Sequence, residues 1–265
     1  DPGGLFKVKK FTVKILDVND PPTDIVLSND DIAENKAKSL VGVLTAKDPD
    51  LGQTYTYTLV NNAGGKFMIS GNELRTTGAL DYEASASLTI RVRVTDSGSP
   101  ALSYEKNFVI TVIDVNETPT KVQLSNYLIN ENPKVDTIVG MITTSDPDNA
   151  NKLWQTFSYK LIDSAQGIFK IEGNQVKVAI PNVDCLKNGG SYCRLNFESS
   201  PTFSVTVQVT DSGSPAKTAT FPLTIQLNNI NDQPRQLTIS NTIVKENDPV
   251  GTVVGVFAYT DEDKG

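Results

Sequence analysis

A segment that occurs twice is the feature of this sequence that most limits its possible folds. Residues 92–100, Val-Arg-Val-Thr-Asp-Ser-Gly-Ser-Pro, return almost unchanged at 207–215, 115 positions later. The segment Asp-Val-Asn-Asp at 17–20 returns as Asp-Val-Asn-Glu at 114–117 and as Asn-Ile-Asn-Asp at 229–232. Recurrence at this spacing indicates repeated structural units, so each unit must fold within roughly 100 residues.

The matching segments divide the 265 residues into four parts. The spacing between matching positions grows from 97 to 115 along the second complete unit, mostly through a 13-residue insertion between Asn174 and Glu198. We predict these parts: 1–19, the end of a preceding unit; 20–116, a complete unit; 117–231, a complete unit with the insertion; and 232–265, the start of a further unit. The chain is therefore expected to be an interior piece of a longer protein.

Alternation of apolar and polar residues predicts strands rather than helices. Residues 88–94 and 203–209 alternate in this way, as a strand with one buried face does. Alternating residues at 11–15, 108–112 and 223–227 predict a strand before each linker. The Asp-Ser-Gly-Ser-Pro segments predict turns, in which Gly tolerates positive φ and Pro ends the strand pairing. About seven short strands in roughly 100 residues predict an all-β chain of tandem immunoglobulin-like sandwiches.

Composition excludes several classes of function. The chain has no histidine, so it has no Ser/His/Asp relay and no imidazole general base. Two cysteines cannot form a four-ligand structural zinc site, and a net charge of -7 argues against a nucleic-acid surface. No apolar run approaches the roughly 18 residues of a membrane span. Any bound metal should be a hard cation held by oxygen ligands.

Acidic residues recur at the predicted strand ends of each unit. In the first complete unit they are Glu34, Asp48, Asp50, Asp81, Glu83, Asp96, Asp114 and Glu117. A single Asp in such a segment is most simply a solvated turn residue. Five acidic motifs in the same order in successive units favour calcium instead. Calcium takes about six to eight oxygen ligands, and the strand ends of two adjoining sandwiches can supply them together.

These motifs resemble the calcium-binding motifs of cadherin repeats. They are Glu-Asn, Asp-x-Asp, Leu-Asp-x-Glu, Asp-x-Gly and Asp-x-Asn-Asp-x-x-Pro, in family order over essentially the whole chain. The resemblance implies seven-strand Greek-key sandwiches arranged end to end, with up to three calcium ions (Ca²⁺) at each junction. It also implies an extracellular location, in the ectodomain of a cell-surface membrane protein. The implied partner is another cadherin-type ectodomain, of the same or of a different kind.

The resemblance implies calcium ligands at three junctions. The first junction takes Asp17, Asn19, Asp20, Asp48, Asp50 and Asp96. The central junction takes Glu34, Asp81, Glu83, Asp114, the carbonyl of Val115, Asn116, Glu117, Asp146, Asp148 and Asp211. The third junction takes Glu131, Glu198, Asn231, Asp232, Asp261 and Asp263.

Three positions depart from the family pattern. Glu117 stands where the family usually has Asp, which keeps the charge but lengthens the side chain. Asn196 and Asn229 also replace Asp, and an amide oxygen keeps a ligand but loses its charge. Calcium affinity in such modules falls with the charge of the ligands. We therefore expect fewer ions, and a softer hinge, near 229–234 than near 114–119.

Cys185 and Cys193 lie eight positions apart within the insertion, around a Gly-Gly pair that suits a tight reversal. In an extracellular chain we expect them to form a local disulfide. The alternative is that the loop projects to contact a partner.

Two functions remain open from the sequence. The first is calcium-dependent cell adhesion or recognition, and the alternative is a rigid, calcium-stiffened spacer or tether in a long surface or matrix protein. We expect no enzyme, because the paired carboxylates have no nucleophile or cleft motif beside them. We also expect no nucleic-acid partner and no direct membrane contact from this segment. Asn116 begins a glycosylation sequon, but it is an expected ligand and Pro119 follows, so no glycan is expected there.

Overall fold

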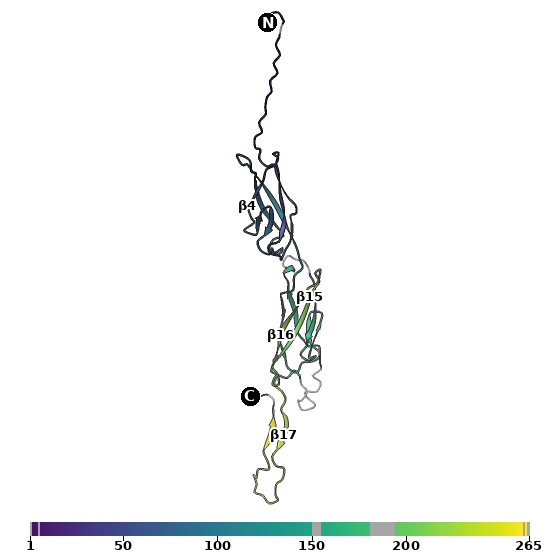
Figure 1. Ribbon diagram of the computed structural model, residues 1–265. Helices are drawn as coiled ribbons and strands as arrows, with labels where there is room; N and C mark the ends of the chain where they lie inside the picture. The colour runs from purple at the N-terminus through teal and green to yellow at the C-terminus, as the bar shows by residue number, and fades with distance from the viewer. Residues whose placement is uncertain (1, 5, 150–154, 181–193, 262, 264–265) are drawn as a thin grey trace. The chain divides into compact units, whose positions relative to one another are not determined.

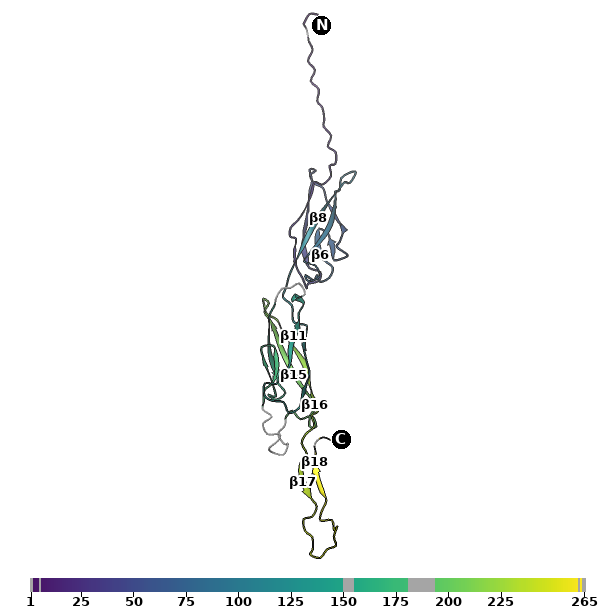
Figure 2. The same ribbon diagram turned by 180° about the vertical axis from the view of Figure 1, so that it is seen from behind.

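The computed structural model describes all residues except 1, 5, 150–154, 181–193, 262 and 264–265. The chain separates into two units, Asp1–Val115 and Asn116–Gly265. Each unit contains one β-sandwich, visible from two sides in Figure 1 and Figure 2. The predicted disulfide between Cys185 and Cys193 lies outside the described residues.

The sandwich of the first unit has two four-stranded sheets. One sheet has the order β1 (Asp24–Leu27), β3 (Leu40–Lys47), β6 (Glu73–Thr76) and β5 (Phe67–Ser70). The other has the order β2 (Asp31–Ala33), β8 (Ser103–Ile113), β7 (Ser87–Thr95) and β4 (Thr56–Asn61). The chain changes sheet between β1 and β2, and β2 then pairs with β8 in parallel. The first strand of a seven-strand sandwich is thus divided into two short strands.

The sandwich of the second unit repeats this topology. One sheet has the order β13 (Phe169–Glu172), β14 (Gln175–Val178), β11 (Ile138–Ser145) and β9 (Lys121–Leu124). The other has the order β10 (Leu128–Asn130), β16 (Thr218–Asn228), β15 (Thr202–Asp211) and β12 (Phe157–Asp163). A 3₁₀ turn, η1 (Pro147–Asn149), precedes β12. Two further strands, β17 (Arg235–Ile239) and β18 (Phe257–Thr260), pair only with each other among the described strands.

The alternating segments form the centre of each sandwich, as predicted. In β7, Ile90, Val92 and Val94 have no exposed surface, while the arginines between them face solvent. In β15, the buried residues Val205 and Val207 alternate with more exposed ones in the same way. Side chains at every second position lie on one face of a strand, so these residues pack between the two sheets. The prediction of an all-β chain of tandem immunoglobulin-like sandwiches is confirmed.

The prediction of a strand at residues 11–15 is wrong. Phe11, Val13 and Ile15 are 75%, 84% and 91% exposed, and no described strand includes them. A strand needs a neighbour for its backbone hydrogen bonds, and none of the described strands pairs with this segment. The equivalent segments 108–112 and 223–227 have such neighbours because they lie in β8 and β16, which pair with β7 and β15.

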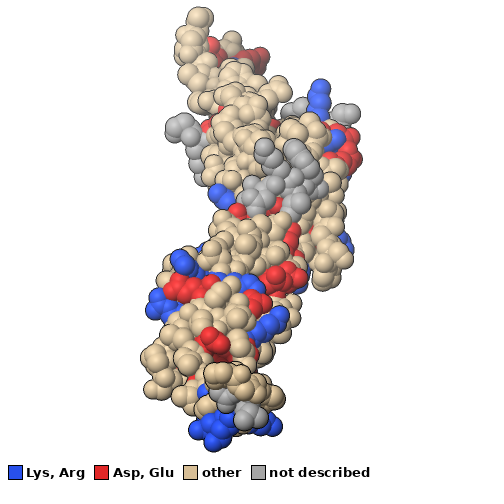
Figure 3. Space-filling view, turned by 90° about the horizontal axis from the view of Figure 1, so that it is seen from above, with Lys and Arg blue, Asp and Glu red and all other residues tan. Residues whose placement is uncertain are grey.

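Charged side chains of opposite sign pair across the exposed faces. Arg91 and Arg93 of β7 contact the carboxylate of Glu105 in β8 at 2.7 and 2.5 Å. In the space-filling view, basic and acidic side chains lie beside one another in small groups (Figure 3). Exposed ion pairs contribute at most about 1 kcal/mol each. The stability of each sandwich therefore depends mainly on its apolar interior.

A glycine lets the segment that enters each sandwich lie against a turn. Asn19 donates a hydrogen bond from Nδ2 to the Pro100 carbonyl at 2.9 Å. A Cβ atom at Gly98 would lie 1.8 Å from Oδ1 of Asn19, and one at Gly213 would lie 1.7 Å from Oδ1 of Asn116. Neither glycine has positive φ, contrary to the expectation for this turn. The Gly of Asp-Ser-Gly-Ser-Pro is required because the asparagine approaches the backbone too closely for any side chain.

Replacing a core leucine should destabilise the first sandwich. Leu74 is completely buried, so Leu74→Ala should lower the free energy of unfolding by about 2–5 kcal/mol through lost burial and the cavity it leaves. Leu51 is 95% exposed, and Leu51→Ala should change that free energy by no more than about 0.5 kcal/mol. Urea denaturation followed by circular dichroism measures both, and equal losses would contradict the assigned core.

Adding a methyl group at Gly98 should displace Asn19. Gly98→Ala should therefore lower the melting temperature of the first sandwich, because its Cβ cannot coexist with the Asn19 side chain. Gly78→Ala is the matched control, since a Cβ there meets nothing within 4 Å and its φ is not positive. Thermal scans of the two variants should differ; a melting temperature for Gly98→Ala equal to that of wild type would refute the close packing.

Candidate metal centre

A buried glutamate closes one end of the first sandwich. Glu34 is 1% exposed, and its carboxylate accepts hydrogen bonds from the backbone N–H of Tyr82 at 2.6 Å and of Val115 at 2.9 Å. The next residue, Asn35, has φ of +63°, a conformation that Asn adopts more readily than most residues. The Glu-Asn motif thus has a structural reason. Asn turns the chain, and Glu ties the last residue of the unit to a loop.

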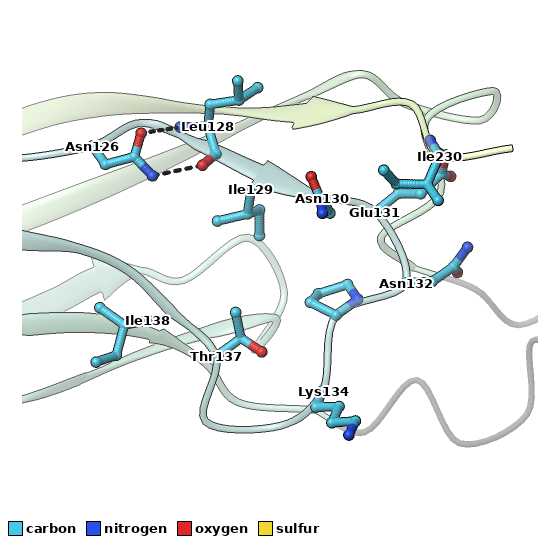
Figure 4. Close-up of a pocket in the computed structure, with 11 residues that line it drawn as sticks. Asn126, Leu128, Ile129, Asn130, Glu131, Asn132, Lys134, Thr137, Ile138 and Ile230 are labelled. Carbon is cyan, nitrogen blue, oxygen red and sulfur yellow. Dashed lines mark hydrogen bonds between the residues drawn. The ribbon is translucent and has the colours of Figure 1, made fainter.

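The second sandwich has the same arrangement. Glu131 is 3% exposed and accepts hydrogen bonds from the backbone N–H of Phe197 and of Ile230, both at 2.8 Å. Asn132 has φ of +51°. Figure 4 shows Glu131 beside Ile230 at the end of β10, along an open groove of about 620 Å³. In both units a buried carboxylate is therefore held inside the end of the sandwich from which the chain leaves.

Further carboxylates gather around Glu34 in the first unit. Glu34, Asp81 and Glu83 each offer an oxygen atom, and these atoms lie within 4.8 Å of one another. Oδ1 of Asp81 accepts a hydrogen bond from the backbone N–H of Ala84 at 2.8 Å, which leaves its second oxygen. Like charges at this distance repel unless a cation lies between them. Carboxylate oxygens are the ligands that a hard divalent cation prefers.

A corresponding group surrounds Glu131 in the second unit. One oxygen atom from each of Glu131, Glu198 and Asp232 lies within 4.8 Å of the others. Burial, followed by the negative charges of Glu131, Asp263 and Asp232, raises the pKa of Glu198. The backbone N–H of Asp232 donates to the Asp263 carboxylate, and the backbone N–H of Asp263 donates to Asp261 at 3.1 Å. The predicted ligands of the third junction that lie in this unit are thus close together.

The opposite end of the first sandwich holds the chain segment that enters it. The backbone N–H of Asp20 donates to Asp50 at 2.8 Å, and the backbone N–H of Asp50 donates to Asp48 at 2.9 Å. Asn19 donates to Asp96 at 3.2 Å. Burial opposes ionisation of Asp96, but hydrogen bonds from its backbone neighbours and Asn19 outweigh it and lower the pKa. Oδ2 of Asp48 is buried and accepts no hydrogen bond within the described part of the chain.

We call this group of carboxylates around the entering chain segment a cradle. The second sandwich has an equivalent cradle that is more buried. The backbone N–H of Glu117 donates to Asp148 at 2.9 Å. Asp146, Asp148 and Asp211 are 8%, 1% and 5% exposed. Burial, followed by the adjacent Asp148 carboxyl group, raises the pKa of Asp146 to about 7. Oδ2 of Asp146 and Oδ2 of Asp211 are buried and accept no hydrogen bond from any described residue, which is costly unless a cation compensates them. These residues fit a calcium ion, whose oxygen ligands they would supply.

Two glutamines in these cradles were not predicted. Nε2 of Gln53 donates to Oδ1 of Asn19, and Nε2 of Gln155 donates to Oδ1 of Asn116, both at 2.6 Å. Each glutamine opens a Gln-Thr-aromatic-Thr/Ser-Tyr segment, at 53–57 and at 155–159. That shared pattern was the available signal, but the loop before it differs in length between the units and concealed the match.

Other predicted ligands are divided between the two units. Glu34, Asp81, Glu83, Asp114 and Val115 belong to the first unit, whereas Asn116, Glu117, Asp146, Asp148 and Asp211 belong to the second. Asp17 is exposed within the segment that forms no strand. Asn231 lies in the second unit and donates a hydrogen bond to the backbone carbonyl of Asp232 at 3.2 Å.

Comparison with known proteins identifies the repeats. The family model described as "Cadherin domain" matches residues 29–113 and 125–228, which together make up more than half of the chain. Each matched range covers most of one sandwich and ends just before a linker motif.

Two curated relatives match almost the whole chain. Human protocadherin Fat 4 is 32% identical over 270 residues, which cover 97% of this chain and 5% of that protein. Chimpanzee (Pan troglodytes) protocadherin alpha-2 is 28% identical over 275 residues, which cover 96% of this chain and 27% of that protein. The chain therefore spans a small part of the length of these relatives.

A solved structure has the same fold. The structure described as "Protocadherin gammaB7 EC3-6 cis-dimer structure" is similar with a TM-score of 0.57 and 23% identity, covering 94% of this chain and 63% of that chain. At this identity the likeness establishes the fold.

The family also determines the class of protein. The relatives are cell-surface protocadherins with extracellular cadherin repeats, in agreement with the predicted location. Cadherins are adhesion proteins rather than enzymes, and the prediction that this chain is no enzyme is confirmed. In the part of the chain that the structure describes, no helix is long and apolar enough to cross a membrane. This chain belongs to the cadherin family and is an extracellular segment built from cadherin repeats.

Proposed function

We propose that this segment binds calcium at the ends of its sandwiches and thereby gives an adhesive ectodomain a defined, stiff shape. One observation carries the proposal: buried carboxylate oxygens of Asp48, Asp146 and Asp211 have no hydrogen-bond donor among the residues that the structure describes. Leaving such oxygens unpaired in a protein interior is unfavourable. A hard divalent cation, when bound, supplies the positive charge that these groups lack.

The central junction, near residues 114–119, is the proposed main site. Eight carboxylates are assigned to it: Glu34, Asp81, Glu83, Asp114, Glu117, Asp146, Asp148 and Asp211. Up to three calcium ions would nearly balance their charge. Asn116 and the carbonyl of Val115 complete the proposed ligands. The junction near 17–20 would use Asp17, Asn19, Asp20, Asp48, Asp50 and Asp96 in the same way.

The junction near residues 229–234 is proposed to hold fewer ions. Asn196 and Asn229 replace two aspartates of the family pattern, so two formal charges are missing. Calcium affinity falls with ligand charge, and this boundary should therefore be the softer one.

The proposed partner is another cadherin-type ectodomain. Membership of the family supports this choice, and the similar protocadherin gammaB7 structure is described as a cis-dimer. A stiffened spacer that carries no binding surface of its own is the second candidate, favoured by the charged pairs on the exposed strands. Sedimentation of the segment in calcium tests pairing between identical copies, since self-association supports adhesion and a monomer at all concentrations excludes that form of it.

Asp146→Asn should change stability in opposite directions with and without calcium. In chelator above pH 7 the variant should melt at a higher temperature than wild type, because Asp146 no longer repels its neighbours Asp148 and Asp211. In about 1 mM calcium the variant should melt at a lower temperature. With a dissociation constant near 0.1 mM, each occupied site contributes about 1.4 kcal/mol, and the variant loses a charged ligand.

Asp30→Asn is the matched control, because Asp30 is exposed and is assigned to no site. Its melting temperature should respond to calcium as that of wild type does. A wild-type melting temperature that does not rise with calcium would contradict the proposed function.

Calcium should also stiffen the boundary at residues 114–119. Without cations, the eight carboxylates assigned there repel one another at short range. Small-angle scattering should report a narrower distribution of maximum dimensions in 1–2 mM calcium, typical of extracellular modules, than in chelator. Identical scattering profiles in the two conditions would exclude calcium-dependent stiffening.

A further inference from the structure

Asp81 and Asn196 begin the same turn in the two units. The backbone N–H of Ser85 donates to the Asp81 carbonyl at 3.1 Å, and that of Ser200 donates to the Asn196 carbonyl at 3.0 Å. The residue before each is a buried leucine, 4% exposed at Leu80 and completely buried before Asn196. The two backbones therefore follow the same path, and the difference between the sites lies in one side chain.

In each turn a side-chain oxygen accepts a hydrogen bond from a backbone N–H three residues later. Oδ1 of Asp81 accepts from Ala84 at 2.8 Å, and Oδ1 of Asn196 accepts from Ser199 at 2.7 Å. A carboxylate has a second oxygen, whereas the other terminal atom of an amide is a nitrogen that only donates. The Ser199 N–H requires an acceptor, so it fixes the amide with its oxygen toward the turn.

The surroundings of the amide make this orientation unfavourable for a cation. Asn196 is 3% exposed, whereas Asp81 is exposed to solvent. The following residue, Phe197, donates its backbone N–H to the buried Glu131. The amide nitrogen carries positive partial charge and has no lone pair for a cation. At the position where the first unit has a carboxylate oxygen, the second unit therefore has a hydrogen-bond donor.

We infer that Asn196 is not a calcium ligand and that it prevents calcium from binding in the half of the 229–234 junction nearer the second sandwich. This inference rests on the proposed calcium function. The sequence led us to expect that the amide would remain a weak ligand. Its oxygen instead caps the turn at Ser199, as Oδ1 of Asp81 does at Ala84, and the atom that corresponds to the second oxygen of Asp81 is a nitrogen, which cannot bind a cation.

The other half of that junction keeps the arrangement found in the second cradle. The backbone N–H of Asp232 donates to Asp263, and that of Asp263 donates to Asp261, just as Glu117, Asp148 and Asp146 are connected. Calcium binding is therefore prevented in only one half of the junction. An ion held by Asn231, Asp261 and Asp263 remains compatible with it.

Three variants of the full 265-residue chain test this inference by equilibrium dialysis with calcium alone. Asn196→Asp should gain about one bound ion per chain, because it restores a second oxygen beside Glu131, Glu198 and Asp232. Asn196→Ala should bind the same number of ions as wild type, although its melting temperature in chelator should fall because the turn loses its cap. Asp81→Asn, the matched change in the first unit, should lose about one ion.

The outcomes separate the inference from the proposed function. Loss of an ion in Asn196→Ala would overturn the inference, since the amide would then be a ligand. A folded Asn196→Asp variant with no additional ion would also overturn it. A wild-type chain that binds no calcium would overturn the proposed function and the inference together, whereas wild-type binding that Asp81→Asn reduces upholds the proposed function whatever the Asn196 variants do.

Discussion

The structure depends on one repeated interaction, a buried glutamate that accepts two backbone hydrogen bonds from different loops. Glu34 connects Tyr82 to Val115, and Glu131 connects Phe197 to Ile230. Hydrogen bonds to a buried carboxylate are strong, but the charge itself remains inside the protein and is unfavourable without a counter-charge. Each sandwich is therefore held together at its end by a group that also attracts a cation. The buried carboxylate that joins the loops would therefore also favour a cation beside it, as the proposed function requires.

The fold was predictable because its determinants are local and repeated. Alternation at 88–94 and 203–209 specified strands with one buried face, and the matching turns specified the length of each unit. Residues 11–15 carry the same alternation yet form no strand. Pairing depends on a neighbouring strand, which a local pattern does not reveal. The division of the first strand into β1 and β2 could not be predicted from alternation either, because both strands are too short to show it.

The candidate site was predictable in composition but not in orientation. The motif positions of Glu34, Asp81 and Glu83 converge, as spacing and family resemblance indicated. The conformation of a single amide did not follow from its identity. Asn196 has the size of Asp and would be expected to act as a weaker version of it, but the turn holds the amide oxygen at the backbone N–H of Ser199. The need for glycine at position 98 could not be predicted either. It arises from the close approach of Asn19, which is distant in sequence.

The parallel pairing of β2 with β8 determines how a sandwich of this kind responds to tension. β2 lies near the start of the sandwich and β8 at its end, and their residues pair side by side from Asp31 with Thr111 to Ala33 with Ile113. A force that pulls the two ends of the unit apart acts along these strands in opposite directions, so it loads their hydrogen bonds in shear. Bonds loaded in shear must break together, whereas bonds at a peeled edge break one at a time. A three-residue strand thus acts as a mechanical clamp between the points where the chain enters and leaves the sandwich.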